Sequence, residues 1–155
     1  MKVQQISVNT PQVQAFIQEL DAFQERLYPS ASNHLDSNET LMQSNVFFVG
    51  AMEDGLKGIG AVKIFGTYGE IKRMFIPKKF RGKGIGKRII QALEAHLIEQ
   101  KIFRAVLETG IHQDAAIGLY ETMGFTKIPP FGSYAEDPLS IFMEKKLPKS
   151  FNKSI

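Results

Sequence analysis

Apolar residues recur every three or four positions in several stretches of the chain, a spacing that places them on one face of a helix. The expected helices cover residues 11–27, 39–43, 84–100 and 114–123. Thr10 is expected to cap the first helix, because its hydroxyl accepts a backbone hydrogen bond and Pro11 fits the first helical position. Gly124 is expected to end the last helix, since glycine readily adopts the left-handed conformation found there.

Continuous apolar runs and shorter alternating segments predict the strands. They cover residues 2–9, 46–52, 56–65, 70–76, 105–108, 125–128 and 139–146. Glu53-Asp54-Gly55 is a turn signal between two apolar runs, and the turn Gly66-Thr67-Tyr68-Gly69 leads into a third strand of the same meander. Because strands and helices alternate along the chain, the pattern predicts an α/β protein with a sheet of mixed direction.

The length and composition of the chain favour a single soluble domain. Its 155 residues match the usual size of one domain, and 43% are hydrophobic, which is enough for a core. With no cysteine, disulfides, thiolate metal sites and cysteine nucleophiles are excluded, and the three histidines are too scattered for a local zinc motif. There is neither a run of about 20 apolar residues nor an apolar N-terminal signal segment. We therefore expect a cytoplasmic protein without a metal or a membrane partner.

Positive charge is concentrated in one segment. Residues 72–88 contain eight of the 19 basic residues and no acidic residue, whereas the rest of the chain has 11 basic and 16 acidic residues, a net charge of −5. A focused basic segment on an acidic protein favours a localised anionic ligand, with a solvated lysine-rich loop as the plain alternative. A nucleic-acid-binding module is a further alternative, but it would need basic residues over a larger surface. We therefore expect no nucleic-acid partner.

Within this segment, Gly82, Gly84 and Gly86 alternate at the start of the third expected helix. Glycines let backbone N–H groups approach a ligand closely, and a helix N-terminus adds about half a positive charge. A Walker A loop is excluded, because its first glycine and its final serine or threonine are both replaced by arginine. A dinucleotide-binding G-x-G-x-x-G is excluded because residue 87 is lysine. The pattern alone indicates a diphosphate site, with an ordinary helix start as the alternative.

Two motifs of the chain resemble those of the GCN5-related N-acetyltransferases, the GNAT family. The sequence Arg81-Gly82-Lys83-Gly84-Ile85-Gly86 resembles the family's R/Q-x-x-G-x-G/A pyrophosphate signature. The family's L-E…N-x-x-A-I-x-L-Y-x-x-x-G-F segment is similar to Leu107-Glu108, Gln113, Ala116-Ile117, Leu119-Tyr120 and Gly124-Phe125. The chain also resembles a bacterial branch of small-molecule acetyltransferases. The resemblance lies in three segments, Leu27-Tyr28-Pro29, Leu107-Glu108-Thr109-Gly110 and Pro130-Phe131-Gly132-Ser133-Tyr134.

The resemblance implies a GNAT-type α/β fold, with a mixed, mostly antiparallel central sheet and helices on both faces. It covers residues 1–147, and residues 148–155 are then expected to form a polar C-terminal tail. The implied activity is transfer of an acetyl group from acetyl-CoA, the cosubstrate, to a primary amine of a small molecule or peptide. Direct transfer is favoured, because the chain has no cysteine to serve as a covalent carrier.

The resemblance also implies which residues hold the cosubstrate. By their positions in the motifs, these are Met74, Phe75, Ile76, Arg81, Gly82, Lys83, Gly84, Ile85, Gly86, Lys87, Gln113, Ala116 and Tyr120. The amides of residues 82–87 would bind the diphosphate, and residues 75–76 would pair with the pantetheine arm, where an amide would polarise the acetyl carbonyl. Gln113 stands where the family commonly has asparagine, so the reach of its amide differs.

Three residues are implied as catalytic. Tyr120 falls on the position of the general acid that protonates the departing thiolate, with core packing as the alternative. Glu108 lies where some relatives keep a general base, although a glutamate at a strand end also serves to anchor loops. Glu70 begins the strand that faces the same cleft and is the second candidate base. For either carboxylate, proton transfer through a bridging water molecule stays an alternative.

Four residues are expected beside the acceptor amine: His34, His112, Phe131 and Tyr134. The plain alternatives are surface histidines and packing aromatics, and a packing or surface role is expected for His96. Two further alternatives stay open, a CoA-binding sensor without catalysis and a homodimer paired through an edge strand. The identity of the acceptor is not encoded in short motifs.

Overall fold

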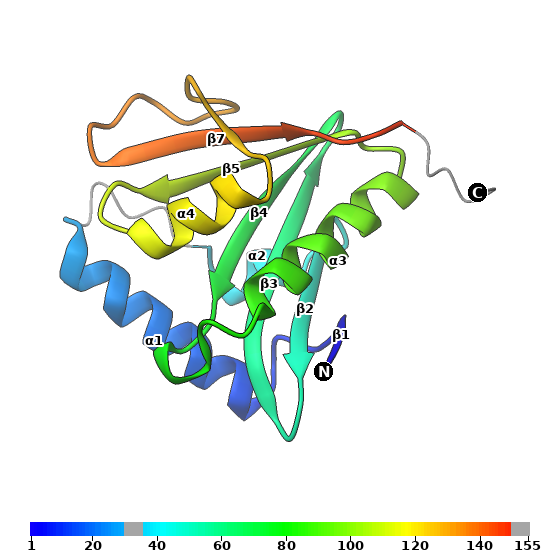
Figure 1. Cartoon of the computed structure of the whole chain (residues 1–155), viewed down its shortest axis with the longest axis vertical. Helices are drawn as coiled ribbons and strands as arrows, with labels where there is room; N and C mark the ends of the chain where they lie inside the picture. Colours follow the sequence, from blue (N-terminus) through cyan, green and yellow to red (C-terminus); the bar gives the residue numbers. More distant parts are fainter. Residues whose placement is uncertain (30–35, 150–155) are drawn as a thin grey trace.

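The computed structural model describes residues 1–29 and 36–149, and within them a seven-stranded sheet has the order β1-β2-β3-β4-β5-β7-β6 (Figure 1). The strands are β1 (Lys2–Gln5), β2 (Val46–Met52), β3 (Leu56–Phe65), β4 (Tyr68–Phe75), β5 (Arg104–Gly110), β6 (Thr126–Ile128) and β7 (Ser140–Lys146). The helices are α1 (Pro11–Leu27), α2 (Asn38–Leu41), α3 (Ile85–Glu99) and α4 (Asp114–Thr122), with a 3-10 helix at Lys78–Phe80. Neighbouring strands pair antiparallel except β4 and β5, which are parallel.

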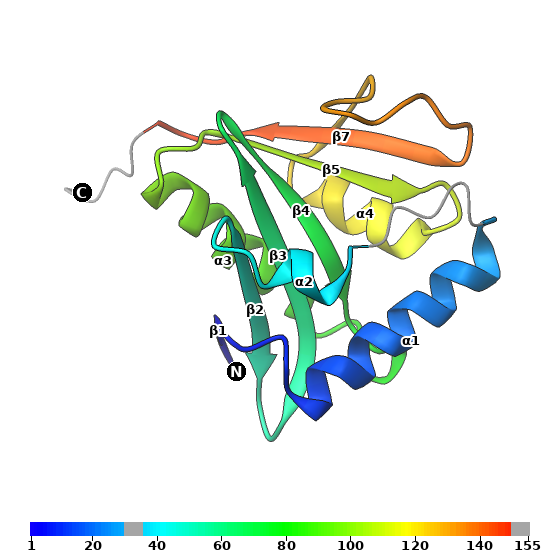
Figure 2. The same ribbon diagram turned by 180° about the vertical axis from the view of Figure 1, so that it is seen from behind.

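Helices cover both faces of the sheet. Figure 1 shows α3 and α4 on the near face, and Figure 2 shows α1 and α2 on the opposite one. Ile89, Leu93 and Leu97 of α3 are fully buried in one core cluster between the helix and the sheet. The apolar side of α1 belongs to a second cluster on the other face. Each fully buried aliphatic side chain of this kind stabilises the fold by about 1.5–3 kcal/mol. The expected mixed, mostly antiparallel sheet with helices on both faces is confirmed.

The sheet opens between β4 and β5. Their parallel pairing is short and ends at Ile71 opposite Leu107. Beyond it the two strands diverge, as Figure 1 shows. A β-bulge lies on this stretch of β4, where Gly60 of β3 faces both Arg73 and Met74, and Arg73 has a positive φ of 56°. The opening exposes one edge of β4 to the space beside α1 and α4, where the cavities described below are found.

Most predicted boundaries agree with the structure to within two residues, whereas the end of the first strand and the turn before β4 need correction. The first strand was expected to reach residue 9 but ends at Gln5, because the chain turns after Ile6 so that Val8 is buried under α1. The turn before β4 was expected to include Tyr68, but Tyr68 pairs with Phe65 within the sheet. Gly66, with a φ of 61°, lets two residues close this hairpin. The N-cap at Thr10 is confirmed, since its hydroxyl oxygen accepts the N–H of Val13 at 3.2 Å.

The structure does not test the expected domain boundary, location or homodimer. No helix among residues 1–29 and 36–149 is long and apolar enough to cross a membrane. The domain boundary at residue 147, the polar tail, the cytoplasmic location and the homodimer stay predictions. Strands β1 and β6 form the two edges of the sheet, which are the places where strand pairing between copies would occur.

His96 on α3 makes stability depend on pH. Its ring stacks on Phe47 with the centroids 3.9 Å apart, and burial lowers its pKa, opposed by the charge of Glu99. Because the folded pKa is lowered, this stabilisation is complete above the unfolded value of about 6.5 and is lost as the pH falls through the folded value. We expect His96→Phe, which keeps the stack, to lose less melting temperature than the wild type between pH 7.5 and 5.5. Equal losses in both proteins would contradict this role.

Candidate active site

The glycine loop shapes the N-terminus of α3. After the 3-10 helix, Gly82 and Gly84 have φ angles of 78° and 79°, in the left-handed region that favours glycine, and a Cβ at either would meet open space. The side chain of Arg81 holds the loop from outside, because its Nε donates to the backbone oxygen of Ile76 at 2.8 Å. The third glycine has a different purpose: a Cβ on Gly86 would lie 2.7 Å from Leu119 of α4. Gly86 therefore lets the two helices pack closely.

The backbone amides of this loop are available for an anion. The first backbone hydrogen bond at the start of α3 joins the N–H of Arg88 to the oxygen of Gly84 at 3.2 Å, and Gly84 provides no side-chain cap. Across the described ranges of the chain, no acceptor bonds the amides of residues 82–87. Unpaired helix N-terminal amides, together with the helix dipole, bind phosphate groups. The loop can therefore hold a diphosphate, as its sequence predicts.

A cavity of about 540 Å³ lies beside this loop. It is lined by the glycine loop, the end of β4, α1 and α4, through Leu20, Phe23, Met74, Phe75, Ile76, Phe80, Arg81, Gly82, Gly84, Ile85, Gly86, Lys87, His112, Gln113, Asp114, Ala115, Ala116, Leu119 and Tyr120. Every residue predicted to hold the cosubstrate is among them except Lys83. We refer to this space as the cofactor cavity.

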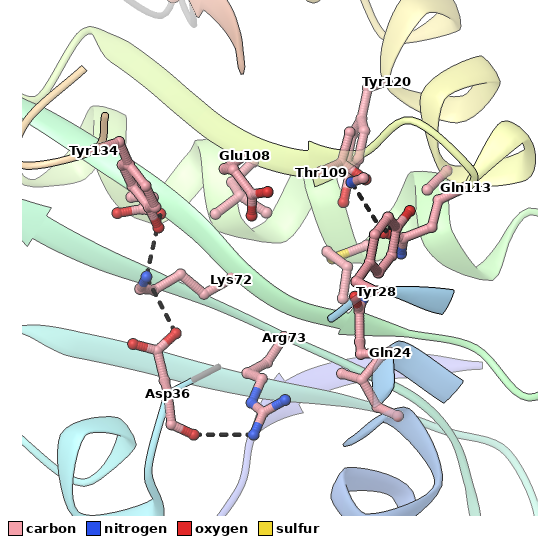
Figure 3. A pocket seen from close by; sticks show the side chains of 16 residues that line it. Gln24, Tyr28, Asp36, Lys72, Arg73, Glu108, Thr109, Gln113, Tyr120 and Tyr134 are labelled. Carbon is pink, nitrogen blue, oxygen red and sulfur yellow. Dashed lines mark hydrogen bonds and ion pairs between the residues drawn. The ribbon is translucent and has the colours of Figure 1, made fainter. Parts of the chain in front are cut away.

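A second pocket adjoins it where β4 and β5 diverge (Figure 3). Its lining is largely polar and consists of Leu20, Gln24, Tyr28, Asp36, Glu70, Ile71, Lys72, Arg73, Met74, Glu108, Thr109, Gly110, Gln113, Ala116, Tyr120 and Tyr134. The residues that line both spaces are Leu20, Met74, Gln113, Ala116 and Tyr120. We call this second space the acceptor pocket, since it contains the predicted catalytic carboxylates.

Tyr120 lies at the junction of the two cavities. It comes from α4, is only 6% exposed, and packs edge-on against Phe125 at a centroid distance of 5.8 Å. Burial raises the pKa of its phenol well above the ordinary value of 10, and the charge of Glu108 adds to this rise. The hydroxyl therefore keeps its proton at neutral pH. Its position and protonation suit a proton donor to a group in the cofactor cavity.

Glu70 is part of a buried charge network. Its Oε2 accepts a hydrogen bond from the hydroxyl of Tyr134 at 2.6 Å and another from Nζ of Lys72 at 3.1 Å. Lys72 also pairs with Asp36 at 3.1 Å, and Arg73 donates to the backbone oxygen of Asp36 at 2.9 Å. Figure 3 shows Tyr134, Lys72 and Asp36 of this network along one wall of the pocket. Burial and the Glu70 charge raise the pKa of Tyr134, so its hydroxyl acts as a donor.

Glu108 lies on β5, opposite Phe142 of β7. Its Oε2 accepts a hydrogen bond from the hydroxyl of Ser140 at 2.8 Å. Figure 3 shows its carboxylate between the Lys72–Tyr134 wall and the Tyr120 side of the pocket. Glu108 and Tyr120 line the same pocket.

The residues predicted to lie beside the acceptor amine are found in different places. Tyr134 lines the acceptor pocket, whereas His112 is exposed and lines the cofactor cavity instead. Phe131 lines neither space, because its ring is buried against Val106 and Phe142. His34 lies outside the described residues.

The basic segment divides between two places. Lys72 and Arg73 are turned into the acceptor pocket in ion pairs with Glu70, Asp36 and Asp21, and only the other six basic residues are exposed near the glycine loop. From the sequence, all eight basic residues were expected to form one anionic-ligand site, and the ion pairs of Lys72 and Arg73 were not predicted. A signal was present, since residues two apart on a strand share a face and Glu70 precedes Lys72 by two.

Comparison with known proteins agrees with the fold. The Acetyltransferase (GNAT) family matches residues 13–125. An IAA acetyltransferase from Azospirillum brasilense is 42% identical over 134 residues, covering 84% of this chain and 88% of the relative. A crystal structure of a "putative acyl-CoA N-acyltransferase" from Klebsiella pneumoniae is 34% identical with a TM-score of 0.80, covering 94% of this chain and 97% of that one. An aminoglycoside 6'-N-acetyltransferase complexed with coenzyme A shares the fold, with a TM-score of 0.71 at 18% identity, over 97% and 100% of the two chains.

The chain therefore belongs to the GNAT acetyltransferase family. It is an acetyltransferase, and the expected transfer of an acetyl group to an amine is confirmed at this level. The nucleic-acid-binding alternative is not favoured. In the part of the chain that the structure describes, no group of three or more histidine or acidic residues is arranged to hold a metal ion.

Proposed function

We propose that the protein transfers acetyl from acetyl-CoA directly to the primary amine of a small molecule or peptide, with both substrates bound together. The observation that carries this proposal is the position of Tyr120, whose side chain lines both the cofactor cavity and the acceptor pocket. A thioester in the first space and an amine in the second would meet beside its hydroxyl. Direct attack needs no covalent carrier, and the chain has no cysteine.

The cofactor cavity is proposed to hold CoA from the glycine loop to Tyr120. The amides of residues 82–87 would bind the diphosphate, and exposed Lys83 and Lys87 would add charge. The end of β4 at Met74 and Phe75, next to its bulge, and the following Ile76 would pair with the pantetheine arm. An amide there would donate to the acetyl oxygen as negative charge develops on it. The coenzyme A complex of the aminoglycoside acetyltransferase with the same fold supports this assignment.

The amine must lose a proton before it attacks. An alkylammonium with a pKa near 10.4 requires about 4–5 kcal/mol to deprotonate at pH 7, so a base is needed. We assign this role to Glu108, directly or through one water, because its carboxylate lines the acceptor pocket between the Lys72–Tyr134 wall and Tyr120. Glu70 already receives a phenol and a lysine on one oxygen, which suits it to hold the pocket wall.

Release of CoA from acetyl-CoA, measured over a panel of amines, tests the proposed function. We expect release with at least one small amine or peptide N-terminus, and mass spectrometry should find the acetylated acceptor. Tight CoA binding without release for any amine would instead support the sensor alternative. Failure to bind CoA at all would overturn the proposal.

Gly84→Ala tests the diphosphate site. A methyl group at a φ of 79° strains the loop and displaces its amides, so we expect the Kd for CoA to rise about 10- to 100-fold, the effect of losing one charge-assisted hydrogen bond. Gly66→Ala is the matched control, because Gly66 also has a positive φ and open surroundings but lies on the β3–β4 hairpin. Calorimetric titration should show normal CoA binding by this control. A similar loss of affinity in both variants would argue against the site.

A further inference from the structure

Tyr28 links the end of α1 to the loop between β5 and α4. Its backbone N–H donates to the oxygen of Gln24 at 3.0 Å and closes the helix, while its side chain is only 4% exposed. The ring stacks on His112 with the centroids 5.6 Å apart and the planes 23° apart. Figure 3 shows the ring beside Gln113, across the pocket from the Lys72 wall.

The Tyr28 hydroxyl joins a small hydrogen-bond network in this loop. It accepts the N–H of His112 at 3.1 Å and donates to Oε1 of Gln113 at 3.4 Å. The same Oε1 also accepts the N–H of Gly110 at 3.0 Å. The carbonyl end of the Gln113 amide is therefore bonded from two sides, which leaves its NH₂ group as the end available to a ligand.

The loop is shaped to admit this tyrosine. A Cβ built on Gly110 would overlap both the hydroxyl oxygen and the ring of Tyr28. The φ of Gly110 is not positive, so its backbone conformation does not call for glycine. Glycine is needed here because a side chain would occupy the space of Tyr28. The contact therefore depends on a matched pair of residues 82 positions apart in the sequence, Tyr28 and Gly110.

We propose that Tyr28 is a positioning residue for the cosubstrate, acting through Gln113. Gln113 lines both cavities, and Tyr28 holds its amide oxygen so that the NH₂ group is oriented toward the pantetheine arm. This inference rests on the proposed function, in which Gln113 contacts the pantetheine. It also accounts for glutamine where the family commonly has asparagine, because the longer side chain lets its oxygen bond the loop while its NH₂ group serves the ligand.

A double-mutant cycle on CoA binding tests the proposal. We expect Tyr28→Phe to raise the Kd for CoA and the KM for acetyl-CoA about three- to tenfold, the effect of one hydrogen bond, with kcat changed less than twofold. In the Gln113→Ala background, Tyr28→Phe should have no further effect on the Kd. Tyr68→Phe is the matched control, since it removes a phenol hydroxyl outside both cavities and should leave the Kd unchanged.

Other outcomes would overturn the proposal. A wild-type Kd in Tyr28→Phe, or an equal loss of affinity in the wild-type and Gln113→Ala backgrounds, would show that Tyr28 does not act through Gln113. Gln113→Asn provides a second route that leaves Tyr28 in place: it should weaken CoA to the same extent as Tyr28→Phe, and wild-type affinity would count against the proposal. If wild-type protein binds no CoA, the proposed function fails as well, whereas normal wild-type binding with an unaffected variant removes only the present inference.

Discussion

Replacing Tyr120 by phenylalanine is expected to lower kcat about 10²- to 10⁴-fold, the usual contribution of general acid–base catalysis. The change removes only the hydroxyl, so the edge contact with Phe125 and the buried ring remain. Without this donor, the thiolate of CoA would depart unprotonated. Burial raises the pKa of Tyr120, so the hydroxyl is protonated and available as a donor at neutral pH, although as a weaker acid than a free tyrosine. Steady-state release of CoA at saturating amine and acetyl-CoA measures the effect.

The Kd for CoA separates this role from packing. We expect Tyr120→Phe to bind CoA within about threefold of the wild type, because the lost interaction forms mainly in the transition state. Tyr68→Phe, which loses a hydroxyl outside the cavities, should keep the wild-type kcat. An unchanged kcat in Tyr120→Phe would mean that another group, or solvent, protonates the leaving thiolate.

Replacing Glu108 by glutamine is expected to lower kcat/KM for the amine about 10²- to 10³-fold at pH 7, within the range of general base catalysis. Glutamine keeps an oxygen to accept the Ser140 hydroxyl, so the strand end should retain its structure. The loss should shrink as the pH rises toward the pKa of the amine near 10.4, because the acceptor then arrives already neutral. The dependence of log(kcat/KM) on pH, compared between variant and wild type, measures this convergence.

Glu70→Gln is the matched comparison for the base. Its side chain is part of the wall formed with Tyr134 and Lys72, so any loss of activity should be nearly independent of pH. If the convergence at high pH is seen in Glu70→Gln and not in Glu108→Gln, the assignments of the two carboxylates must be exchanged. If neither variant converges, the proton leaves the amine by another route.

The local features of the fold were predictable from the sequence because their causes are local. The first helix has its predicted bounds, since the spacing of Val13, Ile17 and Leu20 and the cap at Thr10 all lie within one segment. The glycine loop was predictable for the same reason, because three glycines before a helix determine backbone geometry without help from the rest of the chain. Even so, the β1 boundary was wrong, because burial of Val8 against α1 ends the strand early.

The acceptor pocket was less predictable because its residues come from distant segments. Tyr134, Glu70 and Glu108 were named from the sequence, but the hydrogen bond between Tyr134 and Glu70 forms only because the loop after β6 reaches back to β4. Lys72 was assigned to the wrong group, since charge counting along the chain does not tell which face of a strand a residue occupies. Phe131 was expected beside the acceptor for its aromatic character, yet the same character buries it against Phe142.

The sequence by itself determined the elements, the family and the glycine loop, because periodicity, capping and glycine spacing act over a few neighbouring residues. Only the tertiary structure decided how the site is assembled: the divergence of β4 and β5, the junction at Tyr120, and the contact of Tyr28 with Gly110. These depend on long-range packing, in which side chains far apart along the chain compete for the same space. A local sequence pattern therefore does not predict which of these side chains occupies the space.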